Sequence, residues 1–183
     1  MKHVGLNVAA DPLFTASYTG VNAGMVLAVA DDPGMHSSQN EQDSRHYAKA
    51  SKVMMLEPAD SAECLSFAKM AFELSEQFDT PVILRLTTRI AHSRSLVELG
   101  ERVDNGVREY KKDPQKYVMM PGMAKVRHVV VEDRIQKQIA WAETAPINKV
   151  EYHDTKIGVI TSGICYQYAK EALGDKASYL KLG

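Results

Sequence analysis

The sequence predicts an α/β protein in which helices flank a parallel sheet. Three apolar runs of four to six residues recur along the chain, at residues 25–30, 53–56 and 82–86, the last interrupted only by Arg85. A helical pattern separates the second run from the third, and polar segments follow the first and the third. Runs that are apolar throughout are typical of strands buried on both faces, and alternation of strands with helices is typical of a parallel sheet.

The composition is typical of a soluble cytoplasmic protein. Of the 183 residues, 45% are hydrophobic, which is enough for one core and part of a second. A net charge of −1 gives no indication of nucleic acid or of an anionic membrane as a partner. No apolar run is long enough to span a bilayer, and the N-terminus lacks a signal-peptide pattern. The two cysteines, Cys64 and Cys165, form no CxxC pair, so the sequence indicates neither zinc nor an iron–sulfur cluster and suits a reducing compartment.

The connection after the first predicted strand is unusually long and polar. Residues 31–45 contain a Pro-Gly pair, two adjacent serines and many amides and carboxylates, with almost no apolar residue. Most strand–helix connections are only a few residues long, and longer ones are usually functional or disordered. We therefore expect a binding surface at the end of the strand, although an ordinary solvated loop would explain the composition equally well.

The middle of the chain continues the strand–helix alternation. Asp60 and Glu63 have the spacing of a helix capping box, and they follow the short run at residues 53–56. The helix that they begin carries one apolar stripe, formed by Cys64, Phe67, Ala71, Leu74 and Phe78. A strand at residues 82–86 and a polar turn at residues 87–94 come next.

Residues 98–123 are charged and irregular, and we expect them to cross the surface. A helix is predicted from residue 124 to residue 143, ending before Pro146. Its inner face is predicted to consist of Val131, Ile135, Ile139 and Ala142. Its solvated face is predicted to consist of Arg127, Glu132, Asp133, Arg134 and Lys137.

A second unit is predicted to begin near residue 151. A strand over residues 156–160 ends in Thr-Ser-Gly and runs into a helix at residues 164–173, which is the first βα step of another α/β domain. About ten residues follow that helix, and the first ten residues of the chain have the character of mid-domain sequence. We therefore expect domains at residues 1–150 and 151–183, the first incomplete at its N-terminus and the second present only as its first βα unit.

Several segments together resemble one family. They are HVGLNVAADP at residues 3–12, YTGV at 18–21, the loop at 31–45, TTR at 87–89 with HSR at 92–94, and TSGI at 161–164. Over essentially its whole length the chain resembles the large (alpha) subunit of indolepyruvate:ferredoxin oxidoreductase, one of the thiamine-diphosphate-dependent 2-oxoacid:ferredoxin oxidoreductases. The resembling region is the pyrimidine-binding domain, which faces the diphosphate-binding domain with the cofactor between them.

The resemblance implies an activity for the complete enzyme. Members decarboxylate aryl pyruvates such as indolepyruvate on thiamine diphosphate, add coenzyme A and pass electrons to ferredoxin, with a beta subunit as partner. Segments that this chain lacks hold most of the cofactor and its divalent ion, and the activating glutamate lies upstream of the match. The family contains iron–sulfur clusters, and we expect none in this chain. We therefore assign no catalytic residue and no metal ligand, and expect the isolated chain to be inactive.

The resemblance also suggests binding residues. His3, Gly5 and Asn7 are expected near the aminopyrimidine, unless the last two are simply a turn glycine and a capping asparagine. The loop is expected to recognise a 2-oxoacid carboxylate and a developing oxyanion through His36, Ser37, Ser38, Gln39, Asn40, Glu41 and Gln42. Arg89 is expected to bind an anionic group or to pin one domain to its neighbour.

Other interpretations stay open at this point. Asp43 and Arg45 are expected to form a local pair that shapes the loop, and Asp31, Asp32 and His36 are weak evidence for a metal. The chain could be a non-catalytic interaction module or remnant that associates with other subunits or with itself, because faces that normally meet other domains would be exposed. A generic phosphate-binding role has only the fold class in its favour, since the sequence contains no P-loop or GxGxxG pattern.

Overall fold

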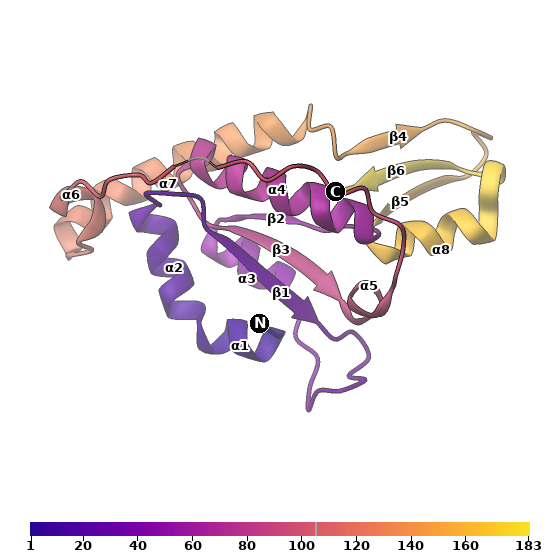
Figure 1. Cartoon of the computed structure of the whole chain (residues 1–183), viewed down its shortest axis with the longest axis horizontal. Helices are drawn as coiled ribbons and strands as arrows, with labels where there is room; N and C mark the ends of the chain where they lie inside the picture. The colour runs from indigo at the N-terminus through magenta and orange to yellow at the C-terminus, as the bar shows by residue number, and fades with distance from the viewer. Residues whose placement is uncertain (105) are drawn as a thin grey trace.

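A computed structural model describes residues 1–104 and 106–183 of the chain. Its first sheet contains β1 (Val26–Asp31), β2 (Met54–Leu56) and β3 (Val82–Thr87) in the order β1-β3-β2 (Figure 1). Both pairings are parallel, and Val26 and Met54 lie opposite Val82 on either side of β3. The predicted parallel sheet flanked by helices is therefore confirmed.

Helix α4 (Ser61–Phe78) covers one face of this sheet. Asp60 accepts a hydrogen bond from the Glu63 backbone N–H at 2.8 Å, as predicted for a capping box. The Glu63 carboxylate accepts from the Ala59 N–H at 2.8 Å, one residue before the position that a standard capping box uses. The predicted stripe packs on the sheet except for Cys64, which is only partly buried. The buried cluster includes Leu56, Phe67, Ala71, Leu74, Phe78, Val82 and Leu84.

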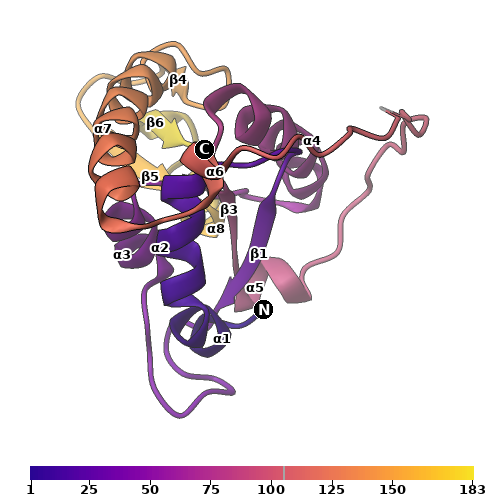
Figure 2. The same cartoon turned by 90° about the vertical axis from the view of Figure 1, so that its left-hand side faces the viewer.

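Helices α1 (His3–Val8), α2 (Ala10–Thr19) and α3 (Ser44–Ser51) cover the other face. Figure 2 shows α2 and α3 on one side of the sheet and α4 on the other. The buried cluster on this side contains Leu6, Leu13, Leu27, Val29, Ala48, Val53 and Ile83. The sequence did not predict α3, because its buried positions include serine and alanine and give no apolar stripe.

The C-terminal half of the first unit differs from its prediction. Helix α7 (Pro121–Ala142) begins three residues earlier than expected, with a proline in its first turn. Its predicted faces were wrong in part, since Arg134 is buried whereas Ile139 and Ala142 are exposed. Arg134 is buried because its Nη1 donates to the Ser17 carbonyl oxygen on α2 at 2.7 Å. The predicted polar turn after β3 contains a short helix, α5 (Thr88–His92).

The predicted irregular excursion over the surface is confirmed for residues 98–104 and 106–113, whereas residues 121–123 belong to α7. Residues 93–104 and 106–113 are almost all exposed and form no helix or strand, and the short helix α6 (Pro114–Tyr117) follows them. Residue 105, which also falls in the predicted excursion, lies outside the described residues. None of the described helices is both long and apolar enough to cross a bilayer.

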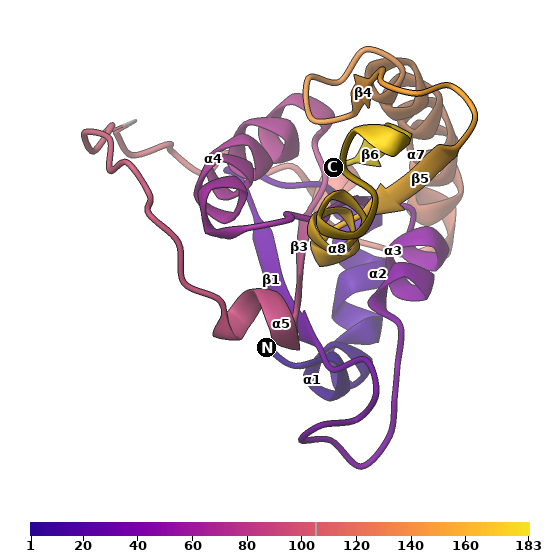
Figure 3. The same ribbon diagram turned by 90° about the vertical axis from the view of Figure 1, so that its right-hand side faces the viewer.

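A second sheet contains β4 (Lys149–Glu151), β5 (Gly158–Ser162) and β6 (Ser178–Leu182) in the order β4-β6-β5. Helix α8 (Ile164–Leu173) and the 3-10 turn η1 (Gly174–Lys176) connect β5 to the parallel strand β6 (Figure 3). The expectation of a lone βα unit was wrong, because the last residues form the central strand of this sheet. Strand β4 crosses the predicted boundary after residue 150, and the division into domains stays a prediction.

Candidate functional site

A pocket of about 250 Å³ lies where the carboxyl ends of the first sheet meet the beginning of α8. The loop after β1 lines it with His36, α5 lines it with Arg89, and Cys165 lines it from α8. Ligand sites of open α/β sheets lie beyond the carboxyl ends of the strands. The pocket is therefore the candidate site, in the place where the long polar loop led us to expect one.

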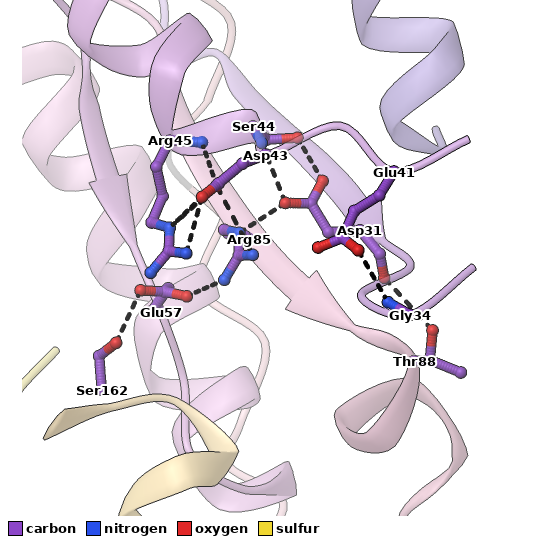
Figure 4. A network of polar contacts seen from close by, with 10 residues as sticks. All are labelled: Asp31, Gly34, Glu41, Asp43, Ser44, Arg45, Glu57, Arg85, Thr88 and Ser162. Carbon is purple, nitrogen blue, oxygen red and sulfur yellow. Dashed lines mark hydrogen bonds and ion pairs between the residues drawn. The ribbon is translucent and has the colours of Figure 1, made fainter. Parts of the chain in front are cut away.

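A buried arginine forms the floor of this pocket. Arg85, which is 6% exposed, donates from Nε to Asp31 at 2.6 Å and pairs through Nη1 with Glu57. The second Glu57 oxygen accepts from the Ser162 hydroxyl at 2.9 Å, so the chain of contacts continues into the second sheet (Figure 4). Asp43 lies farther from Arg85, at 3.7 Å from Nη2. The charge of Arg85 is thus balanced by Asp31 and Glu57, which receive further hydrogen bonds from Ser44 and Ser162.

Strand register explains why these three charges meet. Arg85 lies opposite Val29 of β1, and Asp31 follows two residues later on the same face. Leu56 lies opposite Leu84, which places Glu57, the next residue, beside Arg85. The same face is apolar at Leu27, Val29 and Ile83, so the charged cluster is the last layer of that face at its carboxyl end.

Asp32 anchors the beginning of the loop. Its carboxylate accepts hydrogen bonds from the Ser37 N–H at 2.7 Å, the Thr88 hydroxyl at 2.8 Å and the Ser38 hydroxyl at 2.8 Å. The bond from the Ser37 N–H and then that from Thr88 are the largest causes that lower the pKa of Asp32 well below its usual range. The beginning of the loop is therefore folded around the ionised Asp32 carboxylate, while most of its residues from Pro33 to Glu41 are exposed.

Further contacts hold the tip and the end of the loop. Glu41 accepts from the Gly34 N–H at 3.1 Å, across a turn in which Gly34 has a φ of +80°. The Asn40 carbonyl oxygen lies 3.2 Å from Nε2 of the fully buried His3. Asp43 caps α3 through the Arg45 N–H and pairs with the Arg45 guanidinium at 2.7 Å, as predicted. This pair lowers the pKa of Asp43 to about 2.

The predicted site residues fall into three groups. His36 and Arg89 line the pocket. The other predicted loop residues lie in the same loop without lining the pocket, and they are Ser37, Ser38, Gln39, Asn40, Glu41 and Gln42. Gly5 and Asn7 lie inside α1 and do not line the pocket, so the alternative of a turn glycine and a capping asparagine was wrong. His3 contacts the loop and does not line the pocket.

Sequence reasoning missed Glu57 and Arg85. Each carried a usable signal, because Arg85 is a charge inside an otherwise apolar strand and Glu57 stands at the end of another strand. Charges in buried strands are almost always paired, so each residue predicts a partner of opposite charge nearby. Asp31 and Asp32 are engaged by protein donors, and the described residues contain no cluster of three metal-ligating side chains.

Comparison with known proteins identifies the fold. The family model described as "Pyruvate flavodoxin/ferredoxin oxidoreductase, thiamine diP-bdg" matches residues 19–158, which is most of the chain. The chain belongs to this family. The pocket described above is therefore formed by a thiamine-diphosphate-binding domain of the pyruvate flavodoxin/ferredoxin oxidoreductase family and by the beginning of the segment that follows it.

Relatives named indolepyruvate oxidoreductase subunit IorA are similar over the whole chain, as the resemblance implied. The proteins from Methanothermobacter thermautotrophicus and Pyrococcus horikoshii are 46% and 45% identical over all of it. The protein from Archaeoglobus fulgidus is 43% identical over 94% of it. The chain spans only 28–31% of the length of these relatives.

A solved structure confirms the fold. The chain matches, over 99% of its length, the 2-oxoglutarate:ferredoxin oxidoreductase from Magnetococcus marinus with 2-oxoglutarate, coenzyme A and succinyl-CoA bound. The TM-score is 0.65 at 15% identity, and the match covers 40% of that chain.

The pocket residues do not supply the free carboxylate that would activate the aminopyrimidine of thiamine. Activation of that ring needs a carboxylate that is free to share a proton with it. Glu57 is the pocket's carboxylate, and it already accepts from Arg85 and Ser162. We derive no step of cofactor activation from this pocket.

Proposed function

We propose that this chain supplies the pyrimidine-binding part of a thiamine-diphosphate-dependent oxidoreductase that converts an aryl pyruvate such as indolepyruvate into an acyl-CoA. When bound, thiamine diphosphate supplies the carbanion chemistry of the decarboxylation. Coenzyme A, ferredoxin, a beta subunit and the iron–sulfur clusters belong to the complete enzyme. The names of the relatives and of the family support this assignment.

One observation in the pocket supports a binding role for residues of this chain. Arg85 is neutralised by Asp31 and Glu57, and Arg45 by Asp43. Arg89 is exposed, and it has neither an ion pair nor a side-chain hydrogen bond within the described part of the chain. A guanidinium can bind a carboxylate through two parallel hydrogen bonds, so Arg89 is the group that would bind the carboxylate of a 2-oxoacid. His36, on the facing loop, would lie beside the 2-oxo group.

Binding of phenylpyruvate to the chain tests this role. Replacing Arg89 with alanine removes the cation, so we expect Arg89→Ala to weaken binding by about tenfold or more, measured by titration calorimetry. Arg94→Ala is the matched control, because Arg94 is also exposed but does not line the pocket. Equal affinities of the two variants, or no binding by the unmodified chain, would contradict the assignment of Arg89.

A second function, association with a protein partner or with another copy, is favoured by the second sheet. Val150, Leu180 and Ile160 lie side by side across its three strands and share one face. Val150 is 57% exposed and Ile160 is 73% exposed, so two apolar side chains of this face are open to solvent. We propose that this bare face, defined by Val150, Ile160, Leu180 and Leu182, drives association of the isolated chain.

A further inference from the structure

We propose that Arg85 is a positioning residue that holds the end of the loop at residues 32–43 in place and so shapes the wall of the pocket. The proposal rests on the proposed function only in taking the pocket to be a binding site, since the contacts themselves lie within this chain. It concerns a residue in the middle of a strand, not the loop residues that the sequence singled out.

The first step concerns where the loop ends. The Ser44 N–H donates to Asp31 at 3.0 Å, and the Ser44 hydroxyl donates to the other oxygen of the same carboxylate. Asp31 is 2% exposed, and Arg85 is the cation that faces it. Ser44 is the first residue of α3 and follows the loop directly. Arg85 thus fixes, through Asp31, the point at which the loop enters α3 (Figure 4).

The second step concerns alternative anchors. The beginning of the loop is held by Asp32, whose partners Ser37, Ser38 and Thr88 do not include Arg85. The local pair between Asp43 and Arg45 joins residues that are only two positions apart. Such a pair shapes the chain locally but cannot attach it to the sheet. Apart from the contact of Asn40 with His3 on α1, the end of the loop is attached to β1 and β3 through the Arg85–Asp31–Ser44 contacts and the 3.7 Å approach of Asp43 to Arg85 Nη2.

The third step concerns the reason for an arginine at this position. Asp31 ends one outer strand, β1, and Glu57 directly follows the other, β2, so Arg85 stands between them on the central strand. A planar guanidinium can donate to two carboxylates in different directions at once, which an ammonium group cannot do with the same geometry. Loss of the charge would leave two carboxylates facing each other at the floor of the pocket. The carboxylate of Asp31, which Ser44 contacts, would then lose the cation that holds it in place.

Limited proteolysis of the whole chain tests the proposal. Glu41 is the only glutamate of the loop, so a glutamate-specific protease reports on that segment. We expect Arg85→Met to raise the rate of cleavage after Glu41 by about tenfold under conditions in which circular dichroism shows the chain to be folded. Arg134→Met is the matched control, because Arg134 is equally buried but contacts Ser17 and Asp79, far from the loop in sequence. Its cleavage rate after Glu41 should stay within about twofold of the unmodified chain.

A milder variant keeps the test decisive if Arg85→Met does not fold. Ser44→Ala removes only the hydroxyl contact to Asp31, and we expect it to raise cleavage after Glu41 by about threefold or more. An unchanged rate in the folded Arg85 and Ser44 variants, or an equal rise in Arg134→Met, would overturn the proposal. Phenylpyruvate binding is measured in a separate experiment. If Arg85→Met opens the loop but the unmodified chain does not bind phenylpyruvate, only the proposed function is contradicted.

Discussion

At the scale of single residues, the three arginines that line the pocket differ in their partners. Arg85 is buried between two carboxylates, Arg45 is paired locally with Asp43, and Arg89 is exposed and has no carboxylate partner among the described residues. Removing one partner of a buried pair leaves an uncompensated charge and costs about 3–5 kcal/mol, whereas an exposed pair contributes about 1 kcal/mol or less. Arg85 is therefore a stability residue as well as a positioning residue, and Arg89 is free to serve binding.

The Asp43–Arg45 pair predicts a pH dependence. The pKa of Asp43 is lowered to about 2 in the folded chain, so its contribution to stability is complete above the unfolded pKa of about 3.9. That contribution is lost as the pH falls through the folded value. We expect Asp43→Asn, which can still cap α3, to lower the free energy of unfolding at pH 7 by up to about 1 kcal/mol.

Urea unfolding between pH 7 and pH 2 measures this difference. The difference in free energy of unfolding between the unmodified chain and Asp43→Asn should shrink toward zero as the pH falls from about 4 to about 2. Protonation of Asp43 then removes its charge from the unmodified chain as well. Asp133→Asn is the control, since its pair with Lys137 is exposed on both sides. A difference for Asp43→Asn that does not change with pH would contradict the role of its charge.

At the scale of elements, the two sheets are covered unequally. The first sheet has α4 on one face and α1, α2 and α3 on the other. On the second sheet, Tyr179 points toward α8 and its hydroxyl donates to the Gly174 carbonyl oxygen at 2.7 Å. Ile160 and Leu180 point to the opposite, bare face. Strand β5 also stands at an edge and carries no charged residue to discourage pairing.

This arrangement predicts concentration-dependent association of the chain. We expect the mass from light scattering to rise with concentration, and Ile160→Lys to abolish the rise by placing a charge within the bare face. Leu96→Lys is the matched control, because Leu96 is 99% exposed and belongs to the extended segment after β3. A monomer at every concentration would exclude self-association through this face.

At the scale of the whole molecule, polar contacts join the second sheet to the first. Glu57 accepts from Ser162, and Asp60 accepts from Gln167 at 3.3 Å. Lys181, which is almost fully buried, pairs with both oxygens of Glu63 at 2.5 and 2.6 Å. The three acids all come from the segment between β2 and the first turn of α4. Directional contacts of this kind hold the beginning of α8 against the pocket.

The whole chain is expected to be inactive by itself. It holds two cysteines, whereas an iron–sulfur cluster usually takes four, and the pocket's carboxylate is already engaged. We expect no reduction of a viologen dye when the chain is mixed with indolepyruvate, coenzyme A and thiamine diphosphate. Dye reduction above the level of a Glu57→Gln control would show that the chain carries more of the machinery than we assign to it.

Much of the fold was predictable from local pattern. The strands near residues 25–30, 53–56 and 82–86 and the helix from residue 61 were found because burial on both faces, or along one stripe, leaves a clear periodicity. Helix α3 and the buried face of α7 were missed. Their buried positions include serine, alanine or a hydrogen-bonded arginine, so the hydropathy pattern does not show which face of each helix is buried.

The candidate site was predictable in position but not in composition. By itself the sequence determined that a long polar loop follows a buried strand, and this predicted the candidate site at the carboxyl edge of the sheet. Only the tertiary structure decided that His36 and Arg89 line the pocket and that Ser37 and Ser38 hold the loop. Only strand register brought Arg85 between Asp31 and Glu57. Pairing between strands that are distant in the chain depends on the alignment of the whole sheet, which no local segment encodes.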